Sequence, residues 1–368
     1  MRKFEGFQKG VNLGGWISQF SKYDTAHFDT YITEEDIKNI KDFGFDHVRC
    51  PVDYIVLEDE AGNRKDSGYE YLHNCRKWCE KYGLNMIIDL HECHGYSFDP
   101  MKKDDKKQFF YNPEHQERFL KLWEQIANEF KDYTDHVAFE PLNEVVMFEV
   151  VDAWNDLLTR YIKRMRDICP SVYLVIGGVC YNSVGTVHLL DIPLDDHIVY
   201  NFHCYEPMVF THQGAHWVDC MPLDFRIGYP KTLAEYQKAS TELSKDLAGA
   251  IFEEGISEIG PKFFEDIFRP AIKKAEENNI PLYCGEHGVI DLADKEAAFA
   301  FINKLQVIRR ATNLFDRKSL AIHPASTIFG LFTPEQCAEM SVPDTTVRLS
   351  IGLEAGEDLL EDIKQSLR

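Results

Sequence analysis

Short apolar segments recur along the first 290 residues and alternate with longer amphipathic stretches. Runs of nearly continuous apolar residues are typical of strands that are buried on both faces of a sheet. Seven such runs predict strands, at 10–13, 45–51, 85–91, 136–142, 172–177, 197–205 and 281–286. The alternation of strand and helix predicts a parallel sheet, and seven strands of this kind favour a (β/α)8 TIM barrel over an open sheet.

Two of the intervening stretches carry clear signals for the start of a helix. Thr33 and Asp36 resemble a capping box, and the apolar residues that follow share one face until Gly44. Asn112 and Pro113 predict a cap followed by proline at the first helical position. No glycine-rich phosphate-binding motif follows any predicted strand, which disfavours the nucleotide-binding α/β folds.

Two regions depart from this alternation. The stretch between 205 and 281 is too long for one barrel helix, so we expect a helical insertion at about 218–270 after the sixth strand. Beyond Glu286, Lys295–Arg310 is predicted as a helix and Ser319–His323 as a substitute eighth strand. The expected organisation is therefore a catalytic barrel over 1–290 and an atypical C-terminal segment over 291–368 that completes it.

Composition narrows the classes of partner. The chain is 44% hydrophobic, which excludes disorder, and its net charge of −21 disfavours nucleic acid and anionic membranes as partners. Ten cysteines without a CxxC pair predict reduced, buried thiols. No run reaches 18 apolar residues, and no signal peptide is visible. We therefore expect no membrane partner, and a cytoplasmic protein as written, or a secreted one if a signal was removed.

Polar residues end most of the predicted strands, where a parallel barrel places its catalytic groups. The candidates are Arg49, His91, Asn143, Glu144, His203, Tyr205 and Glu286. Glu144 and Glu286 end the fourth and seventh strands, on opposite sides of a barrel mouth, so their carboxyls can face each other. A facing pair of carboxyls, one protonated and one ionised, is what glycoside hydrolysis needs.

The other candidates have roles around such a pair. Asn143 can hydrogen-bond a sugar 2-hydroxyl. Arg49 and Tyr205 can keep Glu286 ionised and oriented. The two histidines suit sugar hydroxyls or the glutamates, and loop aromatics such as Trp217 and Tyr96 offer faces on which sugar rings can stack.

Plainer interpretations exist for each of these residues. An Asn-Glu pair at a strand end is often a cap or an ion pair, His203 alone fits a core histidine, and Trp217 alone fits packing of the insertion. The run from His91 to His94 resembles a metal cluster, but neighbouring residues of a strand point in different directions. No metal site is therefore predicted.

The strand-end motifs together resemble glycoside hydrolase family 5, the cellulase-like enzymes, over residues 1 to about 290. The motifs are GVNLGGW at 10–16, FDHVRCP at 45–51, DLH at 89–91, FEPLNE at 139–144, VYNFHCY at 199–205, THQGAHW at 211–217 and LYCGEHG at 282–288. The resemblance implies that Glu144 is the acid/base and Glu286 the nucleophile. It also implies retention of anomeric configuration, no cofactor, and β-1,4 or mixed β-1,3/1,4 glucans, as polysaccharide or oligosaccharide, as substrates.

The sequence departs from this family pattern at two places. Glu92 stands where the family usually carries a second histidine. No tryptophan follows Trp217, so the platform that the family places at the end of strand eight is missing. The alternative function is therefore a catalytically weak or inactive barrel that binds glucan.

The C-terminal segment resembles a different family. Residues from about 288 to 368 are similar to the end of PLP-dependent Cys/Met-metabolism enzymes, through KSLAIHPAST at 318–327, LFTPE at 331–335 and VRLSIGLE at 347–354. In that family the arginine of the last motif, which corresponds to Arg348 here, usually binds a substrate carboxylate. The PLP-binding domain and its lysine have no counterpart in 1–287, so we expect no PLP and interpret the chain as a chimera.

Overall fold

The computed structural model describes residues 1–20, 22–102, 105–244, 256–289, 295–310, 319–324, 327, 347–350 and 355–367. The chain divides into two units, Met1–Tyr205 with Gly249–Gly288, and Glu206–Ala248 with Val289–Arg368. The first unit holds all the described barrel elements. In the described part of the chain, no helix combines the length and the apolar character needed to cross a membrane.

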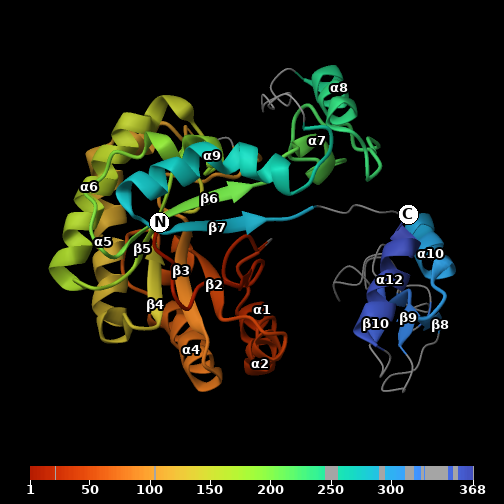
Figure 1. The fold of residues 1–368 in the computed structure, drawn as a ribbon. Coiled ribbons are helices and arrows are strands. Elements are labelled where there is room, and N and C mark those ends of the chain that lie inside the picture. The colour runs from red at the N-terminus through yellow and green to blue at the C-terminus, as the bar shows by residue number, and fades with distance from the viewer. Residues whose placement is uncertain are drawn as a thin grey trace. The chain divides into compact units, whose positions relative to one another are not determined.

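Seven parallel strands of the first unit form one sheet in the order of the sequence, a nearly closed TIM barrel (Figure 1). They are β1 Gly10–Asn12, β2 His47–Asp53, β3 Asn85–Glu92, β4 Val137–Glu140, β5 Leu174–Gly177, β6 Ile198–Cys204 and β7 Leu282–His287. Every residue of β2 and of β6 is buried, as their continuous apolar sequences require. The seven predicted strands are thereby confirmed.

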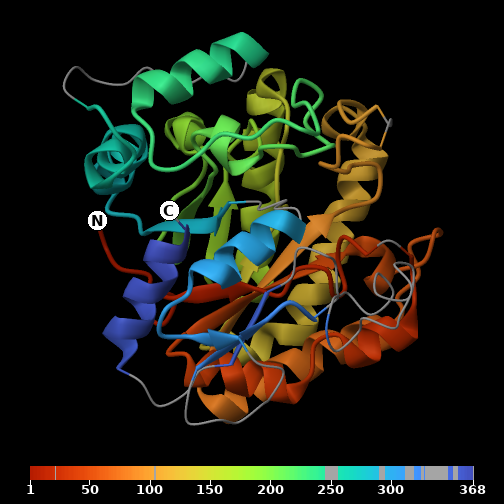
Figure 2. The same ribbon diagram turned by 90° about the vertical axis from the view of Figure 1, so that its right-hand side faces the viewer.

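Helices cover the outside of the strands, as Figures 1 and 2 show from two sides. They are α1 Thr25–Thr30, α2 Glu34–Asp42, α3 Tyr54–Leu57, α4 Asp66–Tyr82, α5 Pro113–Phe130, α6 Val151–Ile168 and α9 Pro261–Asn278, with 3-10 turns η1 Gln108–Phe110, η2 Lys131–Tyr133, η3 Phe148–Val150 and η4 Val184–Leu189. The side chain of Asn112 accepts the Glu114 N–H at 2.8 Å, and Thr33 and Asp36 form a capping box. Both predicted helix starts are confirmed.

The N-terminal residues close the end of the barrel opposite the carboxyl ends of the strands. Phe4 and Phe7 are buried and stack with ring centroids 4.1 Å apart. Phe4 also meets the rings of Tyr173 and Tyr283, at 5.0 Å and 5.9 Å. These aromatics pack with Ile87 and other strand residues as a cluster separate from the main core.

Replacing Phe4 with alanine should therefore lower the free energy of unfolding by about 3 kcal/mol, because it removes a buried ring and leaves a cavity. Urea denaturation followed by tryptophan fluorescence measures this loss. Phe43→Ala is the matched control, since Phe43 is 82% exposed and should change stability by about 0.5 kcal/mol or less. Equal effects of the two substitutions would contradict the packing role of Phe4.

Ser319–His323 is predicted to pair with the barrel as its eighth strand, and this prediction is wrong. Leu320–Ile322 forms a strand, β9, but it is the centre of a separate three-stranded sheet, between β8 Arg309–Arg310 and β10 Arg348–Ser350. No described residue pairs with the outer edges of β1 and β7. Accordingly Leu282, Tyr283 and Cys284 of β7 are only half-buried. A short apolar run predicts a strand but not its neighbour, because pairing depends on distant residues.

Side chains link the two outer strands across the remaining gap. The side-chain amide of Asn12 donates to the Gly285 carbonyl at 3.0 Å. His47 Nε2 lies 2.9 Å from the Tyr283 hydroxyl. These contacts tie β7 to β1 and β2 without a strand between them.

The stretch between β6 and β7, where a helical insertion at about 218–270 is predicted, divides between the two units. Its part from Glu206 to Ala248 belongs to the second unit and contains α7 Met208–Thr211 and α8 Leu233–Leu243. Helix α9 instead groups with the barrel, where it packs against η4 and β7. Pro270 lies inside this helix. A proline removes one backbone hydrogen bond, and the apolar face of α9 packed on the barrel outweighs that loss.

The C-terminal segment contains its own small core. Helix α10 Lys295–Lys304 and helix α12 Gly356–Leu367 accompany β8, β9 and β10. Ile302, Ile308, Ala321 and Leu359 form a separate hydrophobic cluster. The predicted helix over Lys295–Arg310 thus ends at Lys304, and its last two residues form β8. The LFTPE motif at 331–335 lies outside the described residues.

Candidate active site

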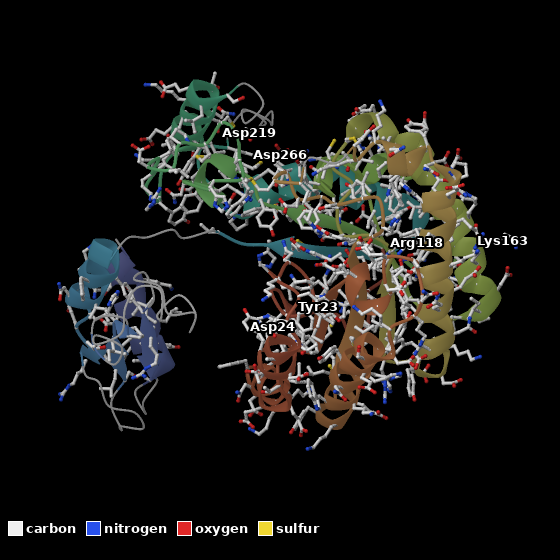
Figure 3. All side chains as sticks on the ribbon, turned by 180° about the vertical axis from the view of Figure 1, so that it is seen from behind. Tyr23, Asp24, Arg118, Lys163, Asp219 and Asp266 are labelled. Atoms are coloured by element: carbon white, nitrogen blue, oxygen red, sulfur yellow. The ribbon has the colours of Figure 1, made fainter. Side chains whose placement is uncertain are left out.

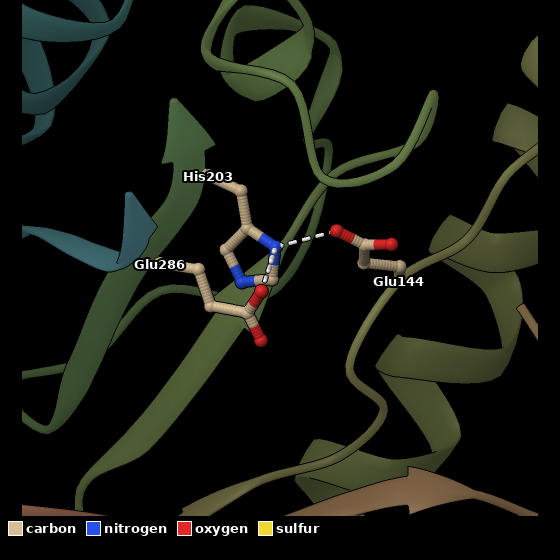
Figure 4. Close-up of side chains that lie close together, drawn as sticks. All are labelled: Glu144, His203 and Glu286. Carbon is tan, nitrogen blue, oxygen red and sulfur yellow. Dashed lines mark hydrogen bonds and ion pairs between the residues drawn. The ribbon is translucent and has the colours of Figure 1, made fainter. Parts of the chain in front are cut away.

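Three side chains meet at the carboxyl ends of the barrel strands (Figure 4). His203 Nδ1 lies 2.7 Å from an oxygen of Glu144 and 3.7 Å from an oxygen of Glu286. One oxygen of each glutamate and the histidine nitrogen all lie within 4.8 Å of one another. The two predicted glutamates are therefore close neighbours, although 142 positions separate them in the sequence.

A local irregularity aligns two of these residues. The register between β6 and β7 shifts after Phe202, so that His203 pairs with Glu286. Bulges of this kind redirect side chains at the ends of strands. Gly285 precedes Glu286, and a Cβ there would lie 2.8 Å from the Asn201 side chain and 3.2 Å from His203 Nε2. The glycine in the LYCGEHG motif is thus required by close packing.

Arg49 lies at the centre of the polar network inside the barrel. One of its terminal nitrogens donates to Glu286 at 2.8 Å, and the other donates to Asn143 at 2.8 Å. Its guanidinium also forms two hydrogen bonds with Glu140, at 2.7 and 2.8 Å. Arg49 is only 1% exposed, so these ion pairs act in a medium that screens them weakly.

Two further predicted residues contact this network. The Tyr205 hydroxyl donates to Glu286 at 2.9 Å. His91 Nδ1 lies 2.6 Å from Asp89, whose carboxylate also lies 3.0 Å from Arg49. Burial opposes the charged form of His91, but Asp89 and Glu286 outweigh it and raise the pKa of His91 to about 9. These carboxylates therefore favour the charged form of His91.

The surroundings give the two glutamates opposite protonation preferences. Burial alone would raise the pKa of Glu286, but His203, Arg49, His91 and the Tyr205 hydroxyl together hold it well below its usual value. Burial raises the pKa of Glu144, and the hydrogen bond from His203 offsets this only in part. Glu286 is thus suited to act as an anion and Glu144 as an acid.

These opposite shifts predict a bell-shaped dependence of kcat/KM on pH. The predicted roles need Glu286 ionised and Glu144 protonated. On the acidic side the rate should therefore fall only at strongly acidic pH, where Glu286 gains a proton. On the other side it should fall above the usual carboxyl range, as Glu144 loses its proton. Initial rates on carboxymethylcellulose, whose leaving sugar oxygen needs a proton, measure the profile. A rate that rises steadily into alkaline pH would contradict the assignment of Glu144.

Two loops hold the backbone around Glu144 and His203. The Tyr181 N–H donates to the Val145 carbonyl, and the His203 N–H donates to the Asn182 carbonyl. The Tyr96 hydroxyl donates to the Glu144 carbonyl at 2.6 Å and accepts the Val146 N–H at 2.9 Å. Tyr96 is buried. Its predicted role as a sugar platform is therefore wrong, because its face is covered by the core.

The described residues contain one group with the geometry of a metal site, formed by Glu144, His203 and Glu286. Arg49 and His91 place two positive charges beside it, and these oppose the binding of a cation. Trp217 belongs to the second unit, where its ring meets His212 and His216. Its contact with substrate stays a prediction.

Sequence reasoning missed the polar residues beneath the site. Asp89, Glu140 and Asn201 are fully buried, and each belongs to the network around Arg49 or Glu286. A signal for them was present, because each is a polar residue within an otherwise apolar strand sequence. A buried charge of this kind requires a partner of opposite charge or several hydrogen bonds.

Comparison with known proteins identifies the barrel. Residues 8–311 match the family model described as cellulase (glycosyl hydrolase family 5). The chain belongs to this family. It is 41% identical to cellodextrinase A of Ruminococcus flavefaciens, over 83% of each chain. It is 40% identical to endoglucanase C of Acetivibrio thermocellus, over 79% of this chain and 84% of that protein.

A solved structure agrees with the fold of this cellulase-family chain. Endoglucanase Cel5A from Thermotoga maritima superposes with a TM-score of 0.58 at 26% identity, over 80% of this chain and 84% of that one. The protein is therefore a glycoside hydrolase of the endoglucanase type. Residues 286–368 match a second model, Cys/Met metabolism PLP-dependent enzyme. The expected chimera of two unrelated families is consistent with both matches.

Proposed function

We propose that this protein is a retaining endo-β-glucanase that hydrolyses β-1,4 or mixed β-1,3/1,4 glucans through a glycosyl-enzyme intermediate. The observation that carries the proposal is the pair formed by Glu144 and Glu286. Their nearest oxygens lie within 4.8 Å, and their surroundings favour opposite protonation states. Retaining glycosidases keep their carboxyls about 5–5.5 Å apart, whereas inverting enzymes leave a wider gap for water.

In the first step a Glu286 oxygen forms a bond to the anomeric carbon of the sugar. The bond from that carbon to the leaving oxygen breaks, and Glu144 transfers its proton to that oxygen. In the second step Glu144 takes a proton from water. The water oxygen then forms a bond to the anomeric carbon, and the bond from the sugar to Glu286 breaks.

The surrounding residues assist both steps. Arg49, His91 and Tyr205 keep Glu286 ionised and oriented. Asn143 is held by Arg49 with its amide nitrogen available for a sugar 2-hydroxyl. His203 Nδ1 lies 2.7 Å from Glu144 and 3.7 Å from Glu286, so its charge can act on both carboxyls.

The test is a panel of barley β-glucan, carboxymethylcellulose, glucomannan, xylan, chitosan and cellohexaose. Release of reducing ends, together with a fast fall in viscosity, is expected on barley β-glucan and on carboxymethylcellulose. Proton NMR of early products should show the β-anomer first. If reducing ends were released from cellohexaose but the viscosity of the polymers did not fall, the enzyme would instead act on oligosaccharides. The name of the Ruminococcus relative suggests such a substrate.

The second candidate function is a glucan-binding barrel with little catalysis. It is favoured by the lack of any tryptophan after Trp217 and by the unpaired edges of β1 and β7 among the described residues. Retarded migration in gels that contain β-glucan, without any release of reducing ends, would support this candidate and overturn the proposed hydrolysis.

A further inference from the structure

Glu140 lies four residues before Glu144, at the end of β4, and is fully buried. The proposed mechanism gives it no task. We propose that Glu140 is a positioning residue that holds the nucleophile Glu286 by two separate routes, one through Arg49 and one through Asn201. The inference rests on the proposed function, since it assumes that Glu286 is the nucleophile.

The first route passes through a side chain. Arg49 donates to both oxygens of Glu140, at 2.7 and 2.8 Å, which fixes the plane of the guanidinium group. The nitrogen at the other edge of the group then donates to Glu286 at 2.8 Å. Asp89 binds Arg49 as well, at 3.0 Å, but only through one oxygen. Glu140 is therefore the group that sets the orientation of Arg49.

The second route passes through the backbone. The Asn201 side-chain amide donates to Glu140 at 2.8 Å, and its carbonyl oxygen accepts the Gly285 N–H at 3.0 Å. Gly285 directly precedes Glu286. Because a Cβ on Gly285 would lie only 2.8 Å from the Asn201 oxygen, the two groups are in tight contact. Glu140 thus orients the amide that holds the β7 backbone beside the nucleophile.

Both routes require Glu140 as a carboxylate. Burial raises the pKa of Glu140 to about 7, yet each of its hydrogen-bond partners is an N–H donor. The two oxygens of an ionised carboxylate can accept all of these hydrogen bonds. In a neutral amide one oxygen is replaced by an NH2 group, which would face a donor of Arg49 or Asn201 and could not accept from it. Glu140→Gln therefore keeps the size of the side chain and disrupts the pattern of donors and acceptors.

The experiment measures the nucleophile directly. The full-length chain is incubated with 2,4-dinitrophenyl 2-deoxy-2-fluoro-β-cellobioside, and intact mass follows formation of the glycosyl-enzyme. Departure of dinitrophenolate needs no proton, so the rate of labelling reports on Glu286 and not on Glu144. We expect Glu140→Gln to slow labelling by about 100-fold, the effect of a misplaced reacting group, with a smaller change in KM for the matching substrate.

The chain offers a control in a second Glu–Arg pair, whose glutamate is buried. Glu58 is 2% exposed and accepts from Arg118 at 2.7 Å. Arg118 lies on α5 in the outer helical layer (Figure 3). Glu58→Gln should lower the melting temperature as Glu140→Gln does, but leave the labelling rate within about twofold. Equal slowing in both variants would show a general loss of structure and overturn the positioning role.

Asn201→Ala tests the second route and keeps the proposal falsifiable if Glu140→Gln does not fold. It leaves the contact between Glu140 and Arg49 intact, and we expect labelling to slow by about 10-fold. Labelling of folded Glu140→Gln or Asn201→Ala at the wild-type rate would overturn the inference. If the wild-type protein is neither labelled nor active on glucans, the proposed function itself fails.

Discussion

Replacing Glu286 with alanine is expected to lower kcat/KM on barley β-glucan by about 10⁵-fold, because no other described side chain is placed to form the covalent intermediate. Reducing-end assays measure the loss. Azide should restore part of the rate of this variant on an activated aryl cellobioside, because the small anion enters the space left by the carboxylate. The product should be the α-glycosyl azide, since a single displacement inverts the anomeric centre.

Two further variants sharpen the test of Glu286. Glu286→Gln keeps the size of the side chain and should be equally inactive while still binding glucan. Glu276→Gln changes an exposed glutamate of α9 and should keep the wild-type rate. Near-normal turnover by Glu286→Gln, or a β-glycosyl azide from Glu286→Ala, would show that the nucleophile is a different residue.

Replacing Glu144 with alanine should lower kcat/KM on β-glucan by about 10²–10⁴-fold, because the departing sugar oxygen then receives no proton. The same variant should form the glycosyl-enzyme almost normally from a dinitrophenyl cellobioside, whose leaving group needs no proton. Azide should accelerate its breakdown and yield the β-glycosyl azide. Stopped-flow release of dinitrophenolate separates the two steps.

The pH profile provides the control for Glu144. The alkaline limb should disappear in Glu144→Gln, because the group that loses its proton there is gone, while the acidic limb of Glu286 should remain. An unchanged alkaline limb in Glu144→Gln would show that another group is the acid. Equal losses on glucan and on the dinitrophenyl substrate would also contradict proton donation by Glu144.

The local parts of the fold could be predicted because their causes are local. Continuous apolar runs such as 45–51 and 197–205 fit strands that are buried on both faces, and β2 and β6 lie there. The cap at Asn112 depends on residues within one helical turn. The candidate site was predictable to the same extent, because polar residues at the ends of parallel strands converge at one end of a barrel.

The errors concern contacts over long distances in the sequence. Ser319–His323 reads as a strand, yet β9 pairs with β8 and β10, because an apolar run does not state which edge it will join. Tyr96 reads as an exposed loop aromatic but lies in the core under the Glu144 backbone.

The sequence by itself determined the elements of the barrel, the residue types at the strand ends, and the resemblance to the cellulase family. Only the tertiary structure supplies the surroundings that raise the pKa of Glu144 and lower that of Glu286. That difference arises from burial and from charges on β2, β3 and β6, which folding brings together from positions up to 237 residues apart. Electrostatic interactions depend on the distance between groups and on their burial, and the number of residues between two groups determines neither.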